Sequence, residues 1–221
     1  MRNIPRKELQ RQRMMAYFID AAHHVIETEG IQAVTIRKVA DLAGYNSATI
    51  YNYFENLDHL ISYASIKYLK EYYLSLEEYI KGAKDTKERF LLIWKKFCIH
   101  SYQNPEIFKT IFFGNIRQSV TEIFNDYFSI YPSDFGEHSS ETLPMLSEGN
   151  IYARNKKVLQ FLVTEDFIKM QDLDELNEVI VTFYRGILAR ILDRNENEEI
   201  DLEEEINKTI RFINKIINLY Q

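Results

Sequence analysis

The sequence has little of what marks secreted, membrane-spanning or disulfide-stabilised proteins. It contains one cysteine, Cys98, so no disulfide can form within the chain. Its first thirty residues lack the apolar core and the small-residue cleavage site of a secretory signal. No stretch approaches the roughly 18 to 20 consecutive apolar residues that a membrane-spanning helix needs. We therefore expect a soluble, cytoplasmic protein.

Glycine and proline are also scarce, with seven and four residues in a chain of 221. Most of them stand where an apolar period of 3.6 residues stops, which is where helix ends place them. Neither an alternating apolar run nor a hairpin signal predicts a strand. The sequence therefore predicts an all-α protein.

The apolar periods and capping residues predict the bounds of these helices. Thr35 and Asn56 are expected to cap two of them, and Asn46 or Ser47 a third. Residues 132–149 hold two prolines and two glycines without a sustained period, so we expect a loop there. The predicted helices run over about 11–29, 35–43, 46–54, 56–82, 85–103, 105–114, 117–130, 150–164, 173–194 and 200–220.

Motifs that would indicate an enzyme are missing. The sequence has no glycine-rich phosphate loop, no nucleophile elbow and no His/Cys cluster with zinc spacing. His23 and His24 are adjacent, so on a helix they point about 100° apart and cannot easily share one ion. We therefore predict no catalytic residue, no metal site and no cofactor.

Net charge is distributed unevenly along the chain. Residues 1–54 hold seven Lys or Arg against five acidic residues, a balance of +2, and the remainder holds 20 against 28, a balance of −8. A basic end on an acidic body is a hint that one part binds a polyanion, although a solvated charged arm would give the same pattern. The basic residues near the start are Arg2, Arg6, Lys7, Arg11 and Arg13.

The segment "IRKVADLAGYNSATIYNYF", residues 36–54, contains two short helical stretches separated by Gly44. Ala40 is small enough for the helices to approach closely, and Gly44 can take the positive φ of a tight turn. Ile50 and Phe54, four residues apart, anchor one face of the second helix. The other face carries side chains suited to base edges and phosphates. This pattern is typical of a DNA-binding helix-turn-helix.

The same segment resembles the DNA-binding signature of the TetR family of bacterial transcriptional regulators. The resemblance covers about residues 11–61; beyond them only the length and the helical organisation agree with that family. The signature is met by Thr35, Val39, Ala40, Ala43, Gly44, Ser47, Thr49, Ile50, Tyr51, Tyr53 and Phe54.

The resemblance implies contacts with DNA. Thr35, Arg37 and Tyr53 would contact phosphates, and Ser47, Ala48, Thr49, Tyr51 and Asn52 would lie toward bases. Leu57 departs from the family, which usually has a phosphate-binding Lys there. Asn56, the amides of the following helix and the basic N-terminal residues can supply other phosphate contacts.

Aromatic residues gather between 94 and 131, where ten of 38 residues are Phe, Tyr or Trp. A dense helical core would explain them, and so would an apolar ligand cavity. A TetR-like regulator ordinarily binds a small molecule in this region, and the lining expected here suits a hydrophobic or aromatic effector. The candidate ligand-binding residues are Tyr68, Trp94, Phe97, Phe108, Phe112, Tyr127 and Phe161.

The last two predicted helices carry more apolar surface than one core contact requires. Gly186, inside the first of them, would let a partner helix approach closely, and a symmetric four-helix bundle is the dimer that the TetR family uses. Packing within one chain is the alternative. The predicted interface residues are Phe183, Gly186, Ile187, Ile191, Ile213 and Ile217.

Together these patterns predict a three-helix DNA-binding domain with a basic arm at 1–55 and a helical ligand-binding and dimerisation domain at 56–221. The predicted function is a ligand-responsive DNA-binding regulator, a homodimeric repressor released from a palindromic operator by a small effector. A helical protein-interaction adaptor without DNA binding is the alternative, and an enzyme is a more distant one.

Overall fold

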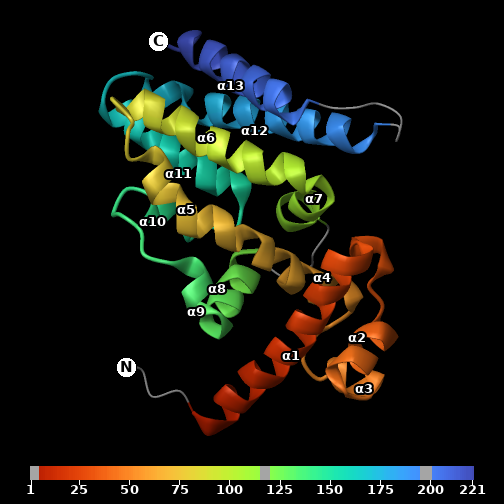
Figure 1. Ribbon diagram of the computed structural model, residues 1–221. Coiled ribbons are helices and arrows are strands. Elements are labelled where there is room, and N and C mark those ends of the chain that lie inside the picture. Colours follow the sequence, from red (N-terminus) through yellow and green to blue (C-terminus); the bar gives the residue numbers. More distant parts are fainter. Residues whose placement is uncertain (1–4, 115–119, 195–200) are drawn as a thin grey trace.

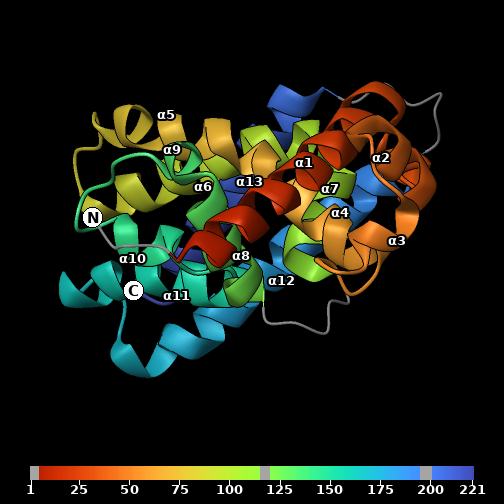
Figure 2. The ribbon, with the colours of Figure 1, turned by 90° about the horizontal axis from the view of Figure 1, so that it is seen from below.

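The computed structural model describes residues 5–114, 120–194 and 201–221, and within them every regular element is a helix. This confirms the all-α prediction. The long helix α1 lies beneath a larger helical body, and two short helices lie beside its C-terminal end (Figure 1). Seen from below, α1 crosses the underside of the body (Figure 2). Over the same residues, no helix is both long and apolar enough to cross a membrane.

Helix α1 (Arg6–Glu29) begins five residues earlier than predicted and ends at Gly30. Residues 6–10 carry no apolar stripe, but they follow Pro5 and favour helix, so helix propensity extends α1 where periodicity gave no signal. The predicted basic arm is therefore largely helical from Arg6 on, whereas Arg2 lies outside the described residues. The buried face of α1 consists of apolar residues three or four positions apart: Met15, Phe18, Ile19, Ala22, Val25 and Ile26.

A short 3₁₀ turn, η1 (Ile31–Ala33), leads to α2 (Ile36–Ala43) and α3 (Ser47–Ile50). The Thr35 hydroxyl accepts a hydrogen bond from the Lys38 N–H at 3.2 Å, and the Asn46 side chain accepts one from the Ala48 N–H at 2.9 Å, so both act as N-caps. Between the helices, Gly44 has φ 74° and ψ 30°. Helix α3 is shorter than predicted because residues 51–53 form a turn.

The predicted helix over 56–82 is divided. Asn56 caps α4 (Leu57–Ile66), accepting a hydrogen bond from the His59 N–H at 2.8 Å. The chain then tightens into the 3₁₀ turn η2 (Lys67–Leu69) and continues as α5 (Lys70–Ile80). No glycine or proline stands at this junction.

The body continues with helices close to the predicted ranges, although the predicted start at 117 lies outside the described residues. The expected loop over 132–149 contains two four-residue helices, each with a proline in its first turn. The elements are α6 (Thr86–Gln103), α7 (Pro105–Phe113), α8 (Val120–Ile130), α9 (Pro132–Phe135), α10 (Leu143–Leu146), α11 (Ile151–Thr164), η3 (Met170–Asp172), α12 (Leu173–Leu192) and α13 (Leu202–Asn218).

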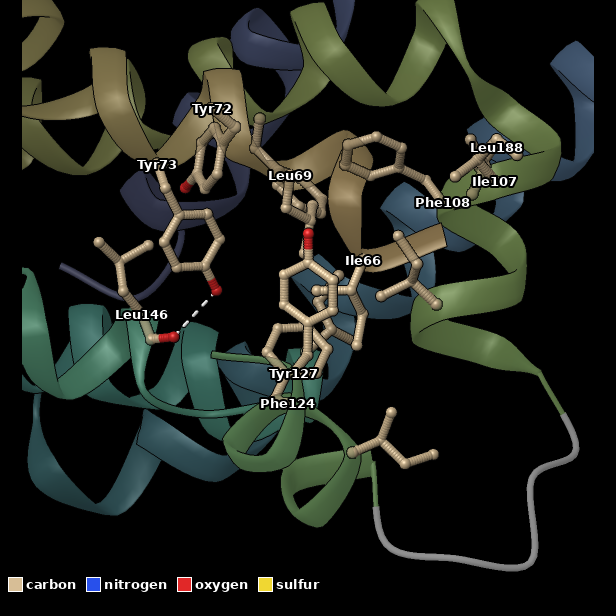
Figure 3. Packing of buried hydrophobic residues seen from close by; sticks show 14 of the residues in the cluster. Ile66, Leu69, Tyr72, Tyr73, Ile107, Phe108, Phe124, Tyr127, Leu146 and Leu188 are labelled. Atoms are coloured by element: carbon tan, nitrogen blue, oxygen red, sulfur yellow. Dashed lines mark hydrogen bonds between the residues drawn. The ribbon is translucent and has the colours of Figure 1, made fainter. Parts of the chain in front are cut away.

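Helix α6 is central to the body, packed against α5, α11, α12 and α13. The core below it is rich in aromatic rings, and Figure 3 shows Tyr72 and Tyr73 of α5 in the same buried cluster as Phe124 and Tyr127 of α8. The Tyr73 hydroxyl donates a hydrogen bond to the carbonyl oxygen of Leu146 at 2.9 Å, which ties α5 to α10. The aromatic excess therefore fills the interior of the body.

Polar contacts join α1 to the body. Asp20 accepts a hydrogen bond from the Lys67 ammonium at 2.7 Å and one from the Tyr131 hydroxyl at 3.0 Å. Lys67 lies in η2 and Tyr131 follows α8, so a single carboxylate on α1 connects two parts of the body.

The left-handed conformation of Gly44 predicts a stability effect. Gly44→Ala should lower the free energy of unfolding by about 1 kcal/mol, because an L side chain is strained at positive φ even where space is free. Gly82 also has free space where a side chain would stand, but it lacks the positive φ, so Gly82→Ala should change the free energy of unfolding by less. Denaturant unfolding followed by circular dichroism measures both; equal effects would contradict the prediction.

Candidate functional site

The outward face of α3 and the turn after it is open to solvent. The Tyr51 side chain is 58% exposed, and Ala48 and Asn52 are also exposed, while Ser47 and Thr49 are half-buried. The opposite face is anchored by Ile50 and Phe54, which are 0% and 1% exposed. The structure thus brings the residues predicted to face bases onto one accessible surface.

The residues predicted to contact phosphate lie around this surface. Thr35 is exposed at the start of α2, although its hydroxyl oxygen already caps that helix. The Arg37 side chain is 89% exposed and its only ion pair among the described residues is a long one, 3.9 Å from Nε to Asp41. Lys38, in contrast, is held by Glu29 at 2.8 Å.

Tyrosine rings extend the surface beyond the predicted residues. Tyr53 is half-buried, with its ring centroid 5.8 Å from that of Phe18. Tyr45 packs edge-on against the same ring at 5.4 Å and remains partly exposed, and the 57% exposed Tyr17 lies 6.4 Å from Tyr45. The sequence analysis did not assign Tyr17 or Tyr45 to this surface; the tyrosine directly after the turn residue Gly44 was the available signal.

The start of α4 explains the departure at Leu57. Leu57 is half-buried and packs against the hydrophobic core. The charged end of a lysine would not make this apolar contact. Leu57 makes it, and the position therefore lacks a positive charge that could bind phosphate. Asp58 follows directly, so the first turn of α4 carries a negative charge.

The body contains a small cavity between α5, α6, α10 and α11. Its volume is about 30 Å³, roughly the room for one water molecule. Two predicted ligand-binding residues, Trp94 and Phe97, line it. Other lining residues are Tyr72, Met145, Arg154 and Asn155.

The other predicted ligand-binding residues do not line this cavity. Phe108 and Phe112 pack behind it, with ring centroids 5.5 and 5.4 Å from that of Phe97. Tyr68 packs against His23, and the Tyr127 hydroxyl donates a hydrogen bond to Asp134 at 2.9 Å. Phe161 borders a separate surface hollow beside the start of α6.

Arg154 and Asn155 are the polar residues of the cavity, and sequence reasoning missed both. They lie on α11 in line with Ile151 and Val158, so they interrupt its apolar stripe. That interruption was the available signal. Asn155 accepts a hydrogen bond from the Trp94 Nε1–H at 2.9 Å and donates one to the Asn177 side chain at 2.9 Å, which connects α6, α11 and α12.

Arg154 is only 4% exposed. Its Nη1 donates a hydrogen bond to the Tyr73 hydroxyl at 2.9 Å, and its Nη2 donates to the Met145 sulfur at 3.7 Å. The guanidinium carbon lies 5.4 Å from the ring centroids of both Tyr73 and Phe112 and 5.9 Å from that of Tyr72. Arg154 is therefore enclosed by aromatic rings.

The outer face of α12 and α13 carries apolar side chains. Val179 and Phe212 are 37% and 41% exposed, and the rings of Phe183 and Phe212 lie 5.7 Å apart across the two helices. Gly186 is exposed, and a side chain at this position would meet nothing within 4 Å. Packing within the protomer therefore does not require a glycine in the middle of α12.

Three residues predicted for the dimer interface lie inside the protomer. Ile213 and Ile217 are both 0% exposed and Ile191 is 7% exposed, so their assignment to an outer contact is wrong. Helix α13 packs against α6 as well as α12, and this contact covers the stripe that contains Ile213 and Ile217. Phe183, Gly186 and Ile187 keep accessible surface.

Possible metal ligands and the single cysteine are the remaining chemistry-bearing groups to consider. Among the described residues, no three His, Cys, Asp or Glu side chains gather as metal ligands. Cys98 is fully buried in α6, and burial raises the pKa of its thiol to about 12, so the thiol stays protonated.

Comparison with known proteins connects this geometry to a family. Residues 18–64 match the family model of bacterial regulatory proteins, tetR family. No curated protein matches the chain in sequence. The fold is similar to that of RolR in complex with the ligand resorcinol, at 14% identity and a TM-score of 0.62, with 97% of this chain and 96% of that chain covered.

Two proteins named FadR are also similar in fold. Thermus thermophilus FadR, a TetR family transcriptional repressor in complex with lauroyl-CoA, gives 13% identity, 90% and 92% coverage and a TM-score of 0.59. The fatty acid degradation regulator FadR from Bacillus halodurans is 16% identical, with 90% of this chain and 93% of that chain covered and a TM-score of 0.53. The helix-turn-helix segment thus matches the model of the tetR family, and the chain as a whole has a fold similar to that of a TetR family transcriptional repressor.

Proposed function

We propose that this protein is a homodimeric repressor that binds a palindromic DNA operator and is released from it by a small molecule bound in the body. The observation that carries the proposal concerns α3 and the turn after it, residues 47–54, called the α3 segment: one side is buried and the other is open to solvent. Ile50 and Phe54 fix one side to the core, while Tyr51 and its neighbours remain open on the other. The matched family model describes bacterial regulatory proteins, and two of the structural relatives are named as a regulator and a transcriptional repressor. A protein with this function acts in the cytoplasm.

The α3 segment enters the major groove in this proposal. Ser47, Ala48, Thr49, Tyr51 and Asn52 face the bases, where hydroxyl, amide and methyl groups can read base edges. Thr35, Arg37 and Tyr53 contact the phosphates on either side. Because Arg37 is almost fully exposed and only loosely paired, little has to be broken before it binds a phosphate.

The dimer forms through the outer face of α12 and α13. Phe183, Gly186 and Ile187 from each protomer would meet their symmetry mates in a four-helix bundle. The two α3 segments must then reach successive major grooves, whose centres lie about 34 to 36 Å apart. A symmetric dimer therefore reads a near-palindrome.

The effector acts through α5 and α4. Tyr72 lines the cavity and Tyr73 binds Arg154, and both belong to α5, which η2 joins directly to α4. Helix α4 packs on α1, so a displacement at the cavity can change the position of α3 in each protomer. A coupling of about 1 to 3 kcal/mol is enough for useful regulation.

Tyr51→Ala should weaken DNA binding by roughly ten- to hundredfold, because it removes a contact to the groove. The thermal unfolding midpoint should stay nearly unchanged, since the side chain is 58% exposed. Fluorescence anisotropy measures binding to duplexes that the purified protein selects from a random library. The matched control is Met170→Ala, an exposed side chain in the body that should leave affinity unchanged. Unchanged affinity of the Tyr51 variant, or loss of its folding, would contradict this placement.

Arg37→Ala should weaken binding to all duplexes alike and reduce the slope of log affinity against log salt by about one, because it removes one phosphate contact. Anisotropy titrations at several salt concentrations measure the slope. A change that depends on the DNA sequence would instead place Arg37 against a base.

Gly186→Arg should shift the protein from dimer to monomer at micromolar concentration, because a long cation at the closest approach of the helices keeps them apart. Gln160→Arg adds the same charge at an exposed position of α11 and should leave the dimer intact. Sedimentation velocity distinguishes the two species. A dimer that tolerates Gly186→Arg would exclude this face as the interface.

A further inference from the structure

The strongest unexplained feature of the body is the charge of Arg154. The side chain is 4% exposed, and no carboxylate of the described residues lies within 4.0 Å of it, the limit for the ion pairs found elsewhere. A buried guanidinium is always protonated and is costly to hold in an apolar interior without a counter-charge. Most cations in the described parts of the chain avoid this cost by staying at the surface.

The groups that contact Arg154 are all neutral. Its hydrogen bonds go to the Tyr73 hydroxyl and to the Met145 thioether, which is a weak acceptor. Burial raises the pKa of Tyr72 and of Tyr73, and the opposing effect of Arg154 is smaller, so both phenols stay protonated at neutral pH. Three aromatic rings around the guanidinium offset part of the cost, but none carries a negative charge.

Arg154 also lines the cavity, beside Trp94 and Phe97. A guanidinium presents five N–H donors in a planar fork that matches two oxygens of one anion. The apolar walls on either side suit a hydrocarbon or aromatic group attached to that anion. The site thus combines one buried cation with an apolar surround.

We propose that Arg154 binds the anionic head of the effector, and that the effector is a small organic acid with an apolar body. This inference rests on the proposed function, in which the body binds an effector, and it adds a charge to the hydrophobic or aromatic molecule expected from the sequence. The shared chemistry is a planar or tetrahedral oxyanion, so carboxylates and phosphate monoesters are both included.

Entry of such a molecule requires the cavity to open, because about 30 Å³ has room for water but not for an organic acid. Met145 is the wall most easily moved. Its unbranched side chain adapts readily, it lies on the four-residue helix α10, and its sulfur makes only a 3.7 Å contact with Nη2. The anion replaces this sulfur as the acceptor for Arg154.

The occupied site then acts on α5. Tyr73 accepts a hydrogen bond from Arg154 and donates one to the Leu146 carbonyl, so it links the cation to both α5 and α10. An anion that pulls on the guanidinium and displaces α10 changes both contacts of this hydroxyl. The binding of charge is thereby transmitted to the helix that continues into α4.

The test compares acids with neutral molecules of the same shape. Trp94 is the single tryptophan of the chain and lines the cavity, so its fluorescence reports occupancy in the full-length protein. The probes are octanoate, octyl phosphate and octan-1-ol, each below its aggregation limit, with benzoate and benzyl alcohol as a shorter pair. We expect at least one acid to bind about ten- to hundredfold more tightly than its alcohol.

Two variants assign the preference to the side chain. Arg154→Met keeps the length and apolar stem but removes the charge, and should bring acid and alcohol to equal affinity. Arg154→Lys keeps the charge without the fork and should retain part of the preference. Without any probe, Arg154→Met should unfold at the same temperature as the natural protein or higher, because a buried unpaired charge has been removed.

Two results would overturn the inference: no acid bound more tightly than its alcohol, or a preference that survives Arg154→Met. The first result, combined with a large loss of thermal stability in Arg154→Met, would identify Arg154 as a packing residue. Relative binding of octanoate and octyl phosphate tells a carboxylate effector from a phosphate one, and either supports the oxyanion site.

Anisotropy with selected duplexes, measured without probes, separates this inference from the proposed function. DNA binding without acid discrimination overturns the Arg154 site alone. Acid discrimination without DNA binding supports the Arg154 site and overturns the proposed regulator.

Discussion

The buried contact of Phe54 with the rings on either side of it is the constraint on which the arrangement depends. Its ring centroid lies 6.4 Å from that of Phe18 in α1 and 5.6 Å from that of Tyr63 in α4, and the side chain is 1% exposed. Phe54 also ends the segment whose other side faces solvent. The direction of that surface is therefore set by α1 and α4 together. Because interiors are close-packed, α4 cannot move without carrying or breaking this contact.

In the proposed mechanism, the body would transmit a displacement through specific polar contacts between its elements. The Tyr63 hydroxyl donates a hydrogen bond to Asp126 of α8 at 3.1 Å. Asp20 accepts hydrogen bonds from both Lys67 and Tyr131. Such contacts have discrete geometries and are kept or lost, whereas apolar packing alone permits small slides. The nearly filled cavity adds a second condition. A molecule must displace side chains to enter, so its affinity includes the cost of opening the body.

The helix-turn-helix could be predicted from sequence because its determinants are local. Thr35 and Asn46 cap helices within three residues, and Gly44 sets the turn by its own conformation. The dimer face was harder to predict. Ile187 and Ile213 both belong to apolar stripes with helical spacing, so the sequence does not distinguish them. Only the position of α6 decides which of them is covered. The sequence did not single out Arg154, because its burial depends on the packing of α5, α6 and α11 around it. No glycine or proline marks the break between α4 and α5 at residues 67–69, so the sequence carries no signal of it.

Under the proposed function, the uneven charge of the chain affects how the molecule meets a duplex. With +2 over residues 1–54 and −8 over the rest, each protomer is an electric dipole. In the field of a polyanion the acidic body is turned away and the basic end forward, so encounters are orientated before any groove contact forms. A weakly basic recognition end can therefore find DNA without strong attraction, and collisions through the wrong face are rejected by repulsion. The negative charge of the body thus helps to orient the molecule as it approaches DNA.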